Sequence, residues 1–146
     1  MSFKISKSNL LFFQNFSRNK LGATLANSGR SDEAVIAYHQ ALTLKPNYPR
    51  AWANLAIAHA NLNQHLDAIR FYLSSLTLNP QATHIWSFIH SAALNISLME
   101  LLPGIENKDV AECSKYVQGV LDDKDLPMPE ELPEPVDEIL RKIELV

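Results

Sequence analysis

The apolar and proline positions of the chain recur at one fixed interval. Leu21, Leu55 and Ile89 are separated by this interval. Four further pairs share it: Ala34 and Ala68, Tyr38 and Tyr72, Pro46 and Pro80, and Trp52 and Trp86. A period of this length, about 34 residues, is typical of tandem helix-turn-helix repeats, each built from two amphipathic helices. Because one repeat cannot bury both apolar faces alone, we expect neighbouring repeats to stack and to leave one concave surface free.

Turn residues and prolines set the expected helix boundaries. Ser31 is a candidate N-cap, Pro46 ends a helix because the residue before it is pushed out of the α region, and Pro49 suits a first turn. Residues 8–18 are compatible with a helix that runs into the first one. The sequence predicts helices over about 19–27, 32–45, 49–61, 66–78 and 83–95.

The pattern changes in the last third of the chain. Pro103 and Gly104 fall where the third repeat would have the interior of its second helix, so we expect the array to end there. A helix over about 108–122, capped by Asn107 or Asp109, would close the open end. An acidic proline-rich linker and a short helix over 136–146 follow. The expected divisions are a poorly matched segment 1–18, repeats 19–97, a helical cap 98–122, and a linker with terminal helix 123–146.

Charge separates the repeats from the rest of the chain. Residues 1–97 hold 8 Lys and Arg against 3 Asp and Glu, whereas residues 98–146 hold 5 against 13, within a net charge of −3. The repeats should therefore favour an anionic ligand, and nothing in the charge suggests nucleic acid. With Cys113 as the single cysteine, no internal disulfide forms and a reducing compartment fits. No apolar run is long enough to span a bilayer, so we expect a cytoplasmic protein without a transmembrane segment.

The sequence contains no pattern typical of catalysis. The five histidines form no HxxxH pair, and there is no glycine-rich phosphate loop or nucleophile elbow. We therefore expect no enzyme activity, no metal and no cofactor. The aromatic residues are better explained by packing than by ligand contact; they are Tyr38, Trp52, Phe71, Tyr72, Trp86 and Phe88.

Packing does not explain the asparagines. Asn27, Asn61 and Asn95 share position 13 of their repeats, and Asn19 and Asn54 occupy positions 5 and 6. Asparagine is a poor residue for a helix interior. Its amide donates and accepts at once, which matches the alternating N–H and C=O groups of an extended peptide. For Asn27 and Asn61 the alternative is a solvated place near a helix end.

Two cations accompany these amides. Lys20 and Arg50 add positive charge to the same surface, although Arg50 fits equally well as a surface residue at a helix start. Together the amides and cations predict a clamp for an extended peptide that carries a carboxylate.

The repeat positions resemble the tetratricopeptide repeat. Small residues at positions 8, 20 and 27 allow close helix approach, and large ones at positions 4, 7 and 24 fill the space between helices. Positions 4, 7, 8, 11, 20, 24, 27 and 32 read Arg18, Leu21, Gly22, Leu25, Ala34, Tyr38, Ala41 and Pro46, then Trp52, Leu55, Ala56, His59, Ala68, Tyr72, Ser75 and Pro80. Arg18 is the main departure. The expected fold is an all-α solenoid of two full repeats and a partial third, with a C-terminal helical cap.

Within this class, residues 19–62 (NKLGATLANSGRSDEAVIAYHQALTLKPNYPRAWANLAIAHANL) resemble the sixth and seventh repeats of the receptor family for type 1 peroxisomal targeting signals. The resemblance implies a cytoplasmic import receptor that cycles to the peroxisomal membrane and its import machinery and binds cargo ending in Ser-Lys-Leu. By resemblance, the peptide-binding residues are the backbone-clamping Asn19, Asn27, Asn54 and Asn61, the groove arginine Arg50, and the groove-wall residues Lys20 and Ala23.

The chain also departs from that family. The family has about seven repeats and WxxxF/Y docking motifs, and this chain has neither, so we expect a truncated or alternatively begun copy. One alternative function is a structural or assembly fragment that docks onto another repeat or chaperone protein. Another is a clamp for acidic chaperone tails, which would need more groove cations than Lys20 and Arg50.

Overall fold

A stack of helices forms the described part of the protein. The computed structural model describes the backbone of residues 7–123 and the side chains of residues 14–122. In chain order, the elements are α1 (Lys7–Asn27), α2 (Ser31–Leu44), α3 (Pro49–Asn61), α4 (His65–Leu78), α5 (Ile85–Asn95), the 3-10 helix η1 (Met99–Leu101), α6 (Leu102–Glu106) and α7 (Val110–Asp123). Every regular element within residues 7–123 is helical, which confirms the all-α expectation. The predicted helix over 136–146 and the linker before it lie outside the described residues.

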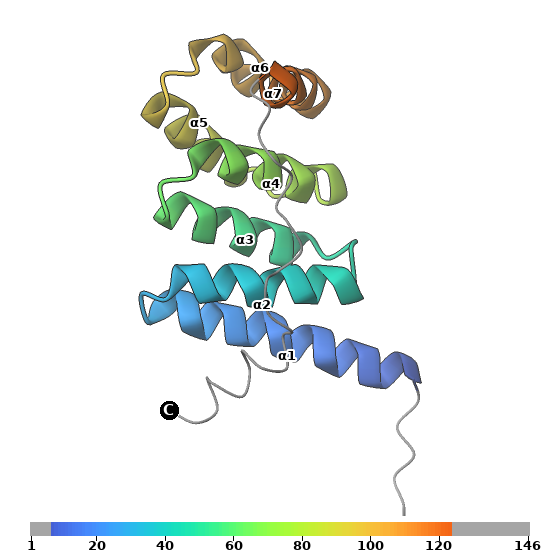
Figure 1. The fold of residues 1–146 in the computed structure, drawn as a ribbon. Coiled ribbons are helices and arrows are strands. Elements are labelled where there is room, and N and C mark those ends of the chain that lie inside the picture. Colours follow the sequence, from blue (N-terminus) through green and yellow to red (C-terminus); the bar gives the residue numbers. More distant parts are fainter. Residues whose placement is uncertain (1–6, 124–146) are drawn as a thin grey trace, which may run out of the picture.

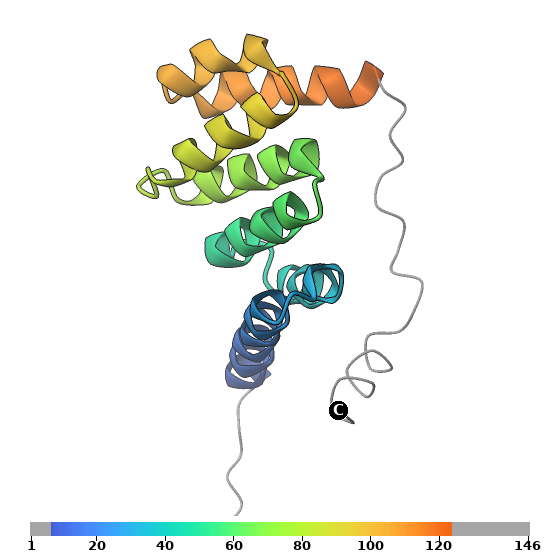
Figure 2. The same ribbon diagram turned by 90° about the vertical axis from the view of Figure 1, so that its left-hand side faces the viewer.

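The helices form antiparallel pairs that follow one another along a single axis. α1 packs along α2 and α3 along α4, while α2 packs on α3 and α4 on α5, joining successive pairs (Figure 1). Figure 2 shows that the array twists, because α2 is seen nearly end-on whereas α7 lies across the view. Residues 8–18, together with Lys7, continue into the first predicted helix as one long α1.

The turns inside the three repeats have one geometry. Gly29, Asn63 and Ser97, which share one repeat position, each have a left-handed backbone, with φ of 74°, 60° and 55°. In each turn, the N–H after the left-handed residue donates to a carbonyl five residues earlier, closing the helix end in a Schellman motif. These bonds are Arg30 to Leu25, Gln64 to His59, and Leu98 to Ala93, each 2.9 Å long. The third repeat therefore begins like the other two.

The small residues of the repeat pattern lie where helices meet. Ala34, Ala41, Ala56 and Ala68 are fully buried, and the Ser75 hydroxyl donates 2.9 Å to the backbone carbonyl of Pro49. This confirms the predicted role of positions 8, 20 and 27 in close helix approach.

Arg18, the departure from the repeat pattern, is accommodated by a polar partner. Its guanidinium donates a hydrogen bond to the side-chain oxygen of Gln40, a buried residue of α2. A polar contact between α1 and α2 thus replaces the expected apolar one.

The expected cap at Ser31 is wrong. Arg30 holds the N-cap position of α2 without a side-chain capping bond, and Ser31 is the first helical residue. The first turn of α2 carries Asp32 and Glu33, and the Glu33 carboxylate pairs with the Arg30 guanidinium. The Schellman turn ends at Arg30, whose N–H bonds to the Leu25 carbonyl. Arg30, and not Ser31, is therefore the residue directly before α2.

In place of a full second helix, the third repeat has only the short η1 and α6, in agreement with the expected end of the array. A short helix, α6, forms around Pro103, which stands in its first turn, where its missing N–H costs nothing. α7 then packs against α4, burying Cys113 and Val117 at the end of the stack (Figure 1). Asp109 accepts a hydrogen bond from the Glu112 N–H at 3.0 Å, which confirms it as a cap.

We predict that Gly22→Ala lowers the free energy of unfolding by about 1–2 kcal/mol despite the better helix propensity of alanine. A Cβ at Gly22 would lie 2.5 Å from the ring of buried Tyr38, so α1 and α2 would have to separate. The matched control is Gly119→Ala in α7, where the Cβ meets no atom within 4 Å. Chemical denaturation should show the control to be equal to or more stable than wild type; two variants of equal stability would contradict the close-approach argument.

Candidate functional site

Each first helix presents a stripe of equivalent residues that is accessible to solvent. The stripe joins positions spaced i, i+4, i+7 and i+11, which lie on one helix face. Its members are Phe16, Lys20, Ala23 and Asn27 on α1, Arg50, Asn54, Ile57 and Asn61 on α3, and His84, Phe88, Ser91 and Asn95 at or on α5. All twelve are exposed or half-buried, whereas Leu25, Leu55 and Ile89 on the same helices are buried. We call this surface the open stripe.

The stripes of the three helices follow one another along the stack. Equivalent members occupy the same repeat position, α1 contacts α3, and α5 packs on α4 as α3 packs on α2. Six of the seven residues predicted to bind a peptide lie on the open stripe: Lys20, Ala23, Asn27, Arg50, Asn54 and Asn61. The structure therefore brings these six residues to one continuous surface.

Asn19, the seventh residue, lies beside the open stripe and is only 7% exposed. Its Nδ2 donates to the Tyr48 hydroxyl at 3.2 Å, and its Oδ1 accepts from Asn54 Nδ2 at 3.2 Å. This bridge ties α1 to α3 and fixes the orientation of the Asn54 amide. Among the described residues, Asn54 Oδ1 accepts no hydrogen bond, which leaves it as an acceptor on the stripe.

The three asparagines at position 13 differ in their surroundings. Asn27 and Asn61 are exposed at the ends of α1 and α3, so a place near a helix end and a ligand role remain alternatives for both. Asn95 donates from Nδ2 to the Ser91 carbonyl of its own helix at 2.9 Å. Its donor is therefore used within α5.

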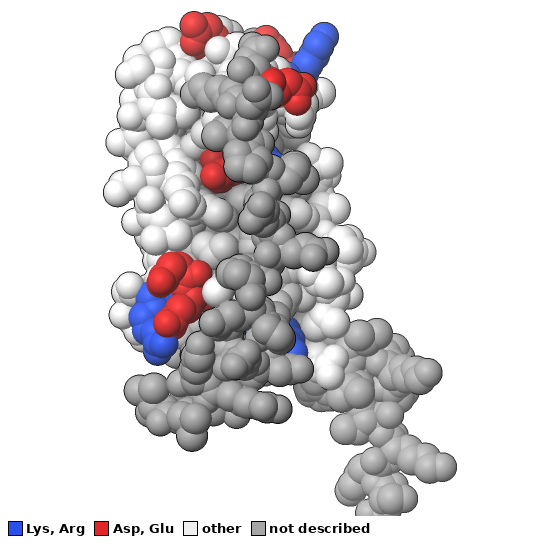
Figure 3. All heavy atoms as spheres, in the orientation of Figure 1, with Lys and Arg blue, Asp and Glu red and all other residues white. Residues whose placement is uncertain are grey.

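Lys20 and Arg50 are the cations of the open stripe, and both are exposed. In the part of the chain with described side chains, the ion pair between Arg30 and Glu33 involves neither of them. In the face shown in Figure 3, charged side chains gather near the α1–α2 turn and near α7, and the surface between them is mostly uncharged. Lys20 and Arg50 are therefore exposed cations of the open stripe that take no part in that ion pair.

The structure confirms most of the predicted packing aromatics. Tyr38, Phe71, Tyr72 and Trp86 are buried. Trp52 is half-buried and donates from Nε1 to the Pro46 carbonyl at 2.7 Å, which fixes the turn before α3.

Phe88 is the exception, because 41% of it is exposed. Its other face packs on the ring of buried Tyr72 in the preceding repeat, so the assignment to packing between repeats holds for that face. Phe88 occupies the same repeat position as Lys20 and Asn54, and this register was the signal in the sequence that places it on the open stripe.

A cluster of rings joins the first repeat to the second, away from the open stripe positions. The His59 ring lies 5.0 Å from the Phe71 ring, and the His39 ring lies 6.4 Å from His59 and 6.1 Å from Phe71. His59 Nδ1 is 2.6 Å from Gln64 Oε1. Burial lowers the pKa of His39, and positive charge on His59 and Arg70 lowers it further. The cluster therefore favours neutral His39.

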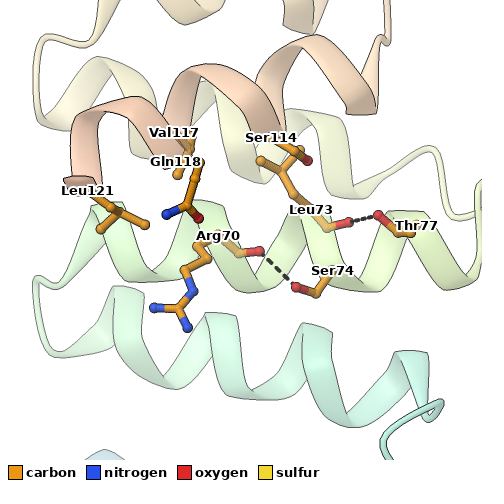
Figure 4. Close-up of a pocket in the computed structure, with 8 residues that line it drawn as sticks. All are labelled: Arg70, Leu73, Ser74, Thr77, Ser114, Val117, Gln118 and Leu121. Carbon is orange, nitrogen blue, oxygen red and sulfur yellow. Dashed lines mark hydrogen bonds between the residues drawn. The ribbon is translucent and has the colours of Figure 1, made fainter. Parts of the chain in front are cut away.

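A small cavity of about 220 Å³ lies between α4 and α7 (Figure 4). It is lined by Arg70, Leu73, Ser74, Thr77, Ser114, Val117, Gln118 and Leu121. The Ser74 and Thr77 hydroxyls donate to the carbonyls of Arg70 and Leu73 in their own helix, as the dashed lines show. None of the predicted peptide-binding residues lines this cavity.

The described residues hold no cluster of metal-ligating side chains and no membrane-spanning helix. No group of three or more His, Cys, Asp or Glu side chains in that part of the chain is arranged to hold a metal ion. None of its helices is long and apolar enough to cross a membrane.

Comparison with known proteins identifies the repeats. A family model described as "TPR repeat" matches residues 22–63, and one described as "Tetratricopeptide repeat" matches residues 49–82. The first tetratricopeptide repeat domain of Spaghetti (RPAP3), solved with a bound HSP90 peptide, superimposes with a TM-score of 0.56 at 19% identity. That match covers 75% of this chain and 96% of the other, and at this identity it shows the fold. The expected tetratricopeptide-repeat solenoid is confirmed.

The curated relatives are peroxisomal targeting signal receptors. Those of Kluyveromyces lactis and Saccharomyces cerevisiae are 54% and 52% identical to this chain over 56 residues. The matched stretch is 38% of this chain but only 10% and 9% of the two receptors. The resemblance to this receptor family is confirmed over that stretch, and the chain matches about a tenth of the length of these relatives.

We predict that protonation of His39 destabilises the fold. Its pKa is lowered in the folded chain and returns toward 6.5 on unfolding, so the unfolded state binds the proton more readily. The free energy of unfolding should therefore fall as the pH drops below about 6.5. Thermal melts at pH 7.5 and 5.5 should show a smaller drop in His39→Gln than in wild type.

The control for this measurement is His90→Gln, since His90 is exposed on α5. It should keep the wild-type drop between the two pH values. If His39→Gln and His90→Gln respond alike, His39 does not carry the acid sensitivity.

Proposed function

We propose that this chain of tetratricopeptide repeats is a non-catalytic module that binds an extended peptide along the open stripe of α1 and α3. The peptide belongs to the class that ends in Ser-Lys-Leu or a variant and directs cargo into peroxisomes. The observation that carries the proposal is the amide bridge between Asn19 and Asn54, which presents a fixed amide on a surface that also carries two exposed cations. Support also comes from the similarity to peroxisomal targeting signal receptors over 56 residues.

The amides match the needs of an extended backbone. A peptide that lies across α1 and α3 presents alternating N–H and C=O groups, and side-chain amides satisfy both kinds. Asn54 offers its Oδ1 in an orientation that Asn19 holds, and exposed Asn61 and Asn27 extend the row toward the helix ends. Ala23 adds little bulk between them, which leaves room for a peptide side chain.

The cations supply the preference for a terminal carboxylate. Lys20 and Arg50 are exposed on neighbouring first helices, and charge-assisted hydrogen bonds to a carboxylate are stronger than neutral ones. Both lie in solvent, so their contribution should decrease as salt increases.

A peptide on the open stripe is contacted from one side. Fewer contacts and weaker pre-organisation raise the entropic cost of binding. We therefore expect an affinity about 10–100-fold below that of a repeat array that contacts the peptide from both sides. In a cell, the proposed partners are the C-terminal peptides of peroxisomal cargo and the import machinery, and the module would act in the cytoplasm and cycle to the peroxisomal membrane.

We predict that Asn61→Ala weakens binding of a fluorescent peptide ending in Ser-Lys-Leu. Loss of one neutral hydrogen-bonding group costs about 0.5–1.5 kcal/mol, which is roughly 2–13-fold in the dissociation constant. Fluorescence anisotropy measures this loss directly. Asn61 is exposed, so the substitution should leave the melting temperature unchanged, unlike Asn54→Ala, which also removes the bridge to Asn19.

Asn47→Ala is the matched control, because Asn47 is an exposed asparagine in the turn before α3 and lies off the open stripe. It should bind the peptide as wild type does. Equal affinity of the Asn61 and Asn47 variants would return Asn61 to the role of a helix-end residue. No binding by wild type, together with self-association, would favour the assembly alternative.

We predict that amidation of the peptide C-terminus weakens binding to wild type and has little effect on a Lys20→Gln, Arg50→Gln double variant. The amide removes the negative charge that the two cations would attract, and raising salt should reduce the difference further. A Lys108→Gln, Lys115→Gln double variant controls for net charge, since both lysines are exposed and lie off the open stripe. If wild type binds the free acid and the amide equally, the carboxylate preference is wrong.

A further inference from the structure

The open stripe changes its chemistry on α5. At the position where α1 carries Lys20 and α3 carries Asn54, α5 carries Phe88. The row formed by this repeat position therefore runs from a cation through an amide to an aromatic ring. Next to this row, Ile57 on α3 is 37% exposed.

The Phe88 ring packs on a buried ring at its inner side and lies next to an exposed ring of the same stripe. It lies 5.7 Å from the ring of Tyr72, tilted by 34°, and Tyr72 is buried in α4. The His84 ring meets it edge-on at 6.0 Å. A ring held in this way loses little freedom when a ligand covers its outer face, which favours its use as an anchor.

The position of Phe88 distinguishes it from the exposed apolar residues that lie off the open stripe. Single exposed apolar side chains are common and need no function. Leu78 and Met99, for example, are 43% and 50% exposed but lie outside the repeated stripe. Phe88 and Ile57, by contrast, are on the same face as the amides and cations that we propose to hold the peptide.

We infer that Phe88, with Ile57, forms an apolar subsite that selects peptides with a bulky apolar side chain upstream of the C-terminal tripeptide. This inference rests on the proposed function. The charge pattern sets the direction, because the carboxylate would lie near Lys20 and Arg50 and the chain would run toward the uncharged α5 stripe.

The repeat spacing sets the position of the selected residue. Because α5 packs on α4 and α4 on α3, the first helices α3 and α5 are up to two packing distances of about 8–10 Å apart, and an extended peptide advances about 3.3 Å per residue. Phe88 lies one first helix beyond Arg50 and two beyond Lys20. The selected side chain should therefore lie about three to six residues before the C-terminus.

The test compares two sets of fluorescent peptides that all end in Ser-Lys-Leu. One set carries a single leucine at each position from three to six residues before the C-terminus, and the other carries serine there. Wild type should bind one leucine peptide about 5–10-fold more tightly than its serine partner. Phe88→Ala should abolish this preference and Phe88→Leu should retain most of it.

Leu78→Ala is the control, since Leu78 is an exposed apolar residue outside the open stripe. It should keep the wild-type preference. The ratio between paired peptides is insensitive to a general loss of folded protein, so a destabilised Phe88→Ala variant can still be interpreted.

The outcomes separate the two proposals. Equal binding of leucine and serine peptides by wild type, or a preference that survives in Phe88→Ala, would overturn the apolar subsite alone. Failure of wild type to bind any of the peptides would overturn both the subsite and the proposed function.

Discussion

The close approach of paired helices at small residues is the constraint on which the rest of the structure depends. Gly22 lies against the ring of Tyr38, and fully buried Ala56 occupies the place of Gly22 in the next repeat. Each small residue lets a large one from the partner helix fill the interface, so the paired helices pack densely. Since the same contacts recur from one repeat to the next, the helix pairs stack in a regular way.

This regular stacking also creates the candidate site. The inner faces of α1, α3 and α5 are buried in the core, while the open stripe of each helix is accessible to solvent. The stripes align because the repeats that carry them stack in register. The alignment brings Lys20, Asn54 and Phe88 into one row although they are far apart in the sequence. A site of this kind needs no loop of its own, because the scaffold that carries it also positions its side chains.

Much of the fold was predictable because it depends on local patterns. The repeat period and the prolines predicted α3 with the bounds that the structure has, and Asp109 was correctly expected as a cap. The errors concern positions where neighbouring residues override the signal of the residue itself. Ser31 resembles an N-cap residue, but the Schellman turn ends at Arg30, and Arg30 holds the N-cap position. Pro103 resembles a helix breaker, but at a first turn it starts α6.

The sequence by itself determined the number and type of the repeats, and with them the residues that share the open stripe, because helical periodicity is a local property. Only the tertiary structure decided how those residues divide between folding and exposure. Asn19 turned out to be a buried bridge to Asn54, and Phe88 turned out to be partly exposed beside Tyr72. The physical reason is that the burial of a residue depends on which helix lies opposite it. That helix can come from a distant part of the chain, as α7 does when it packs against α4.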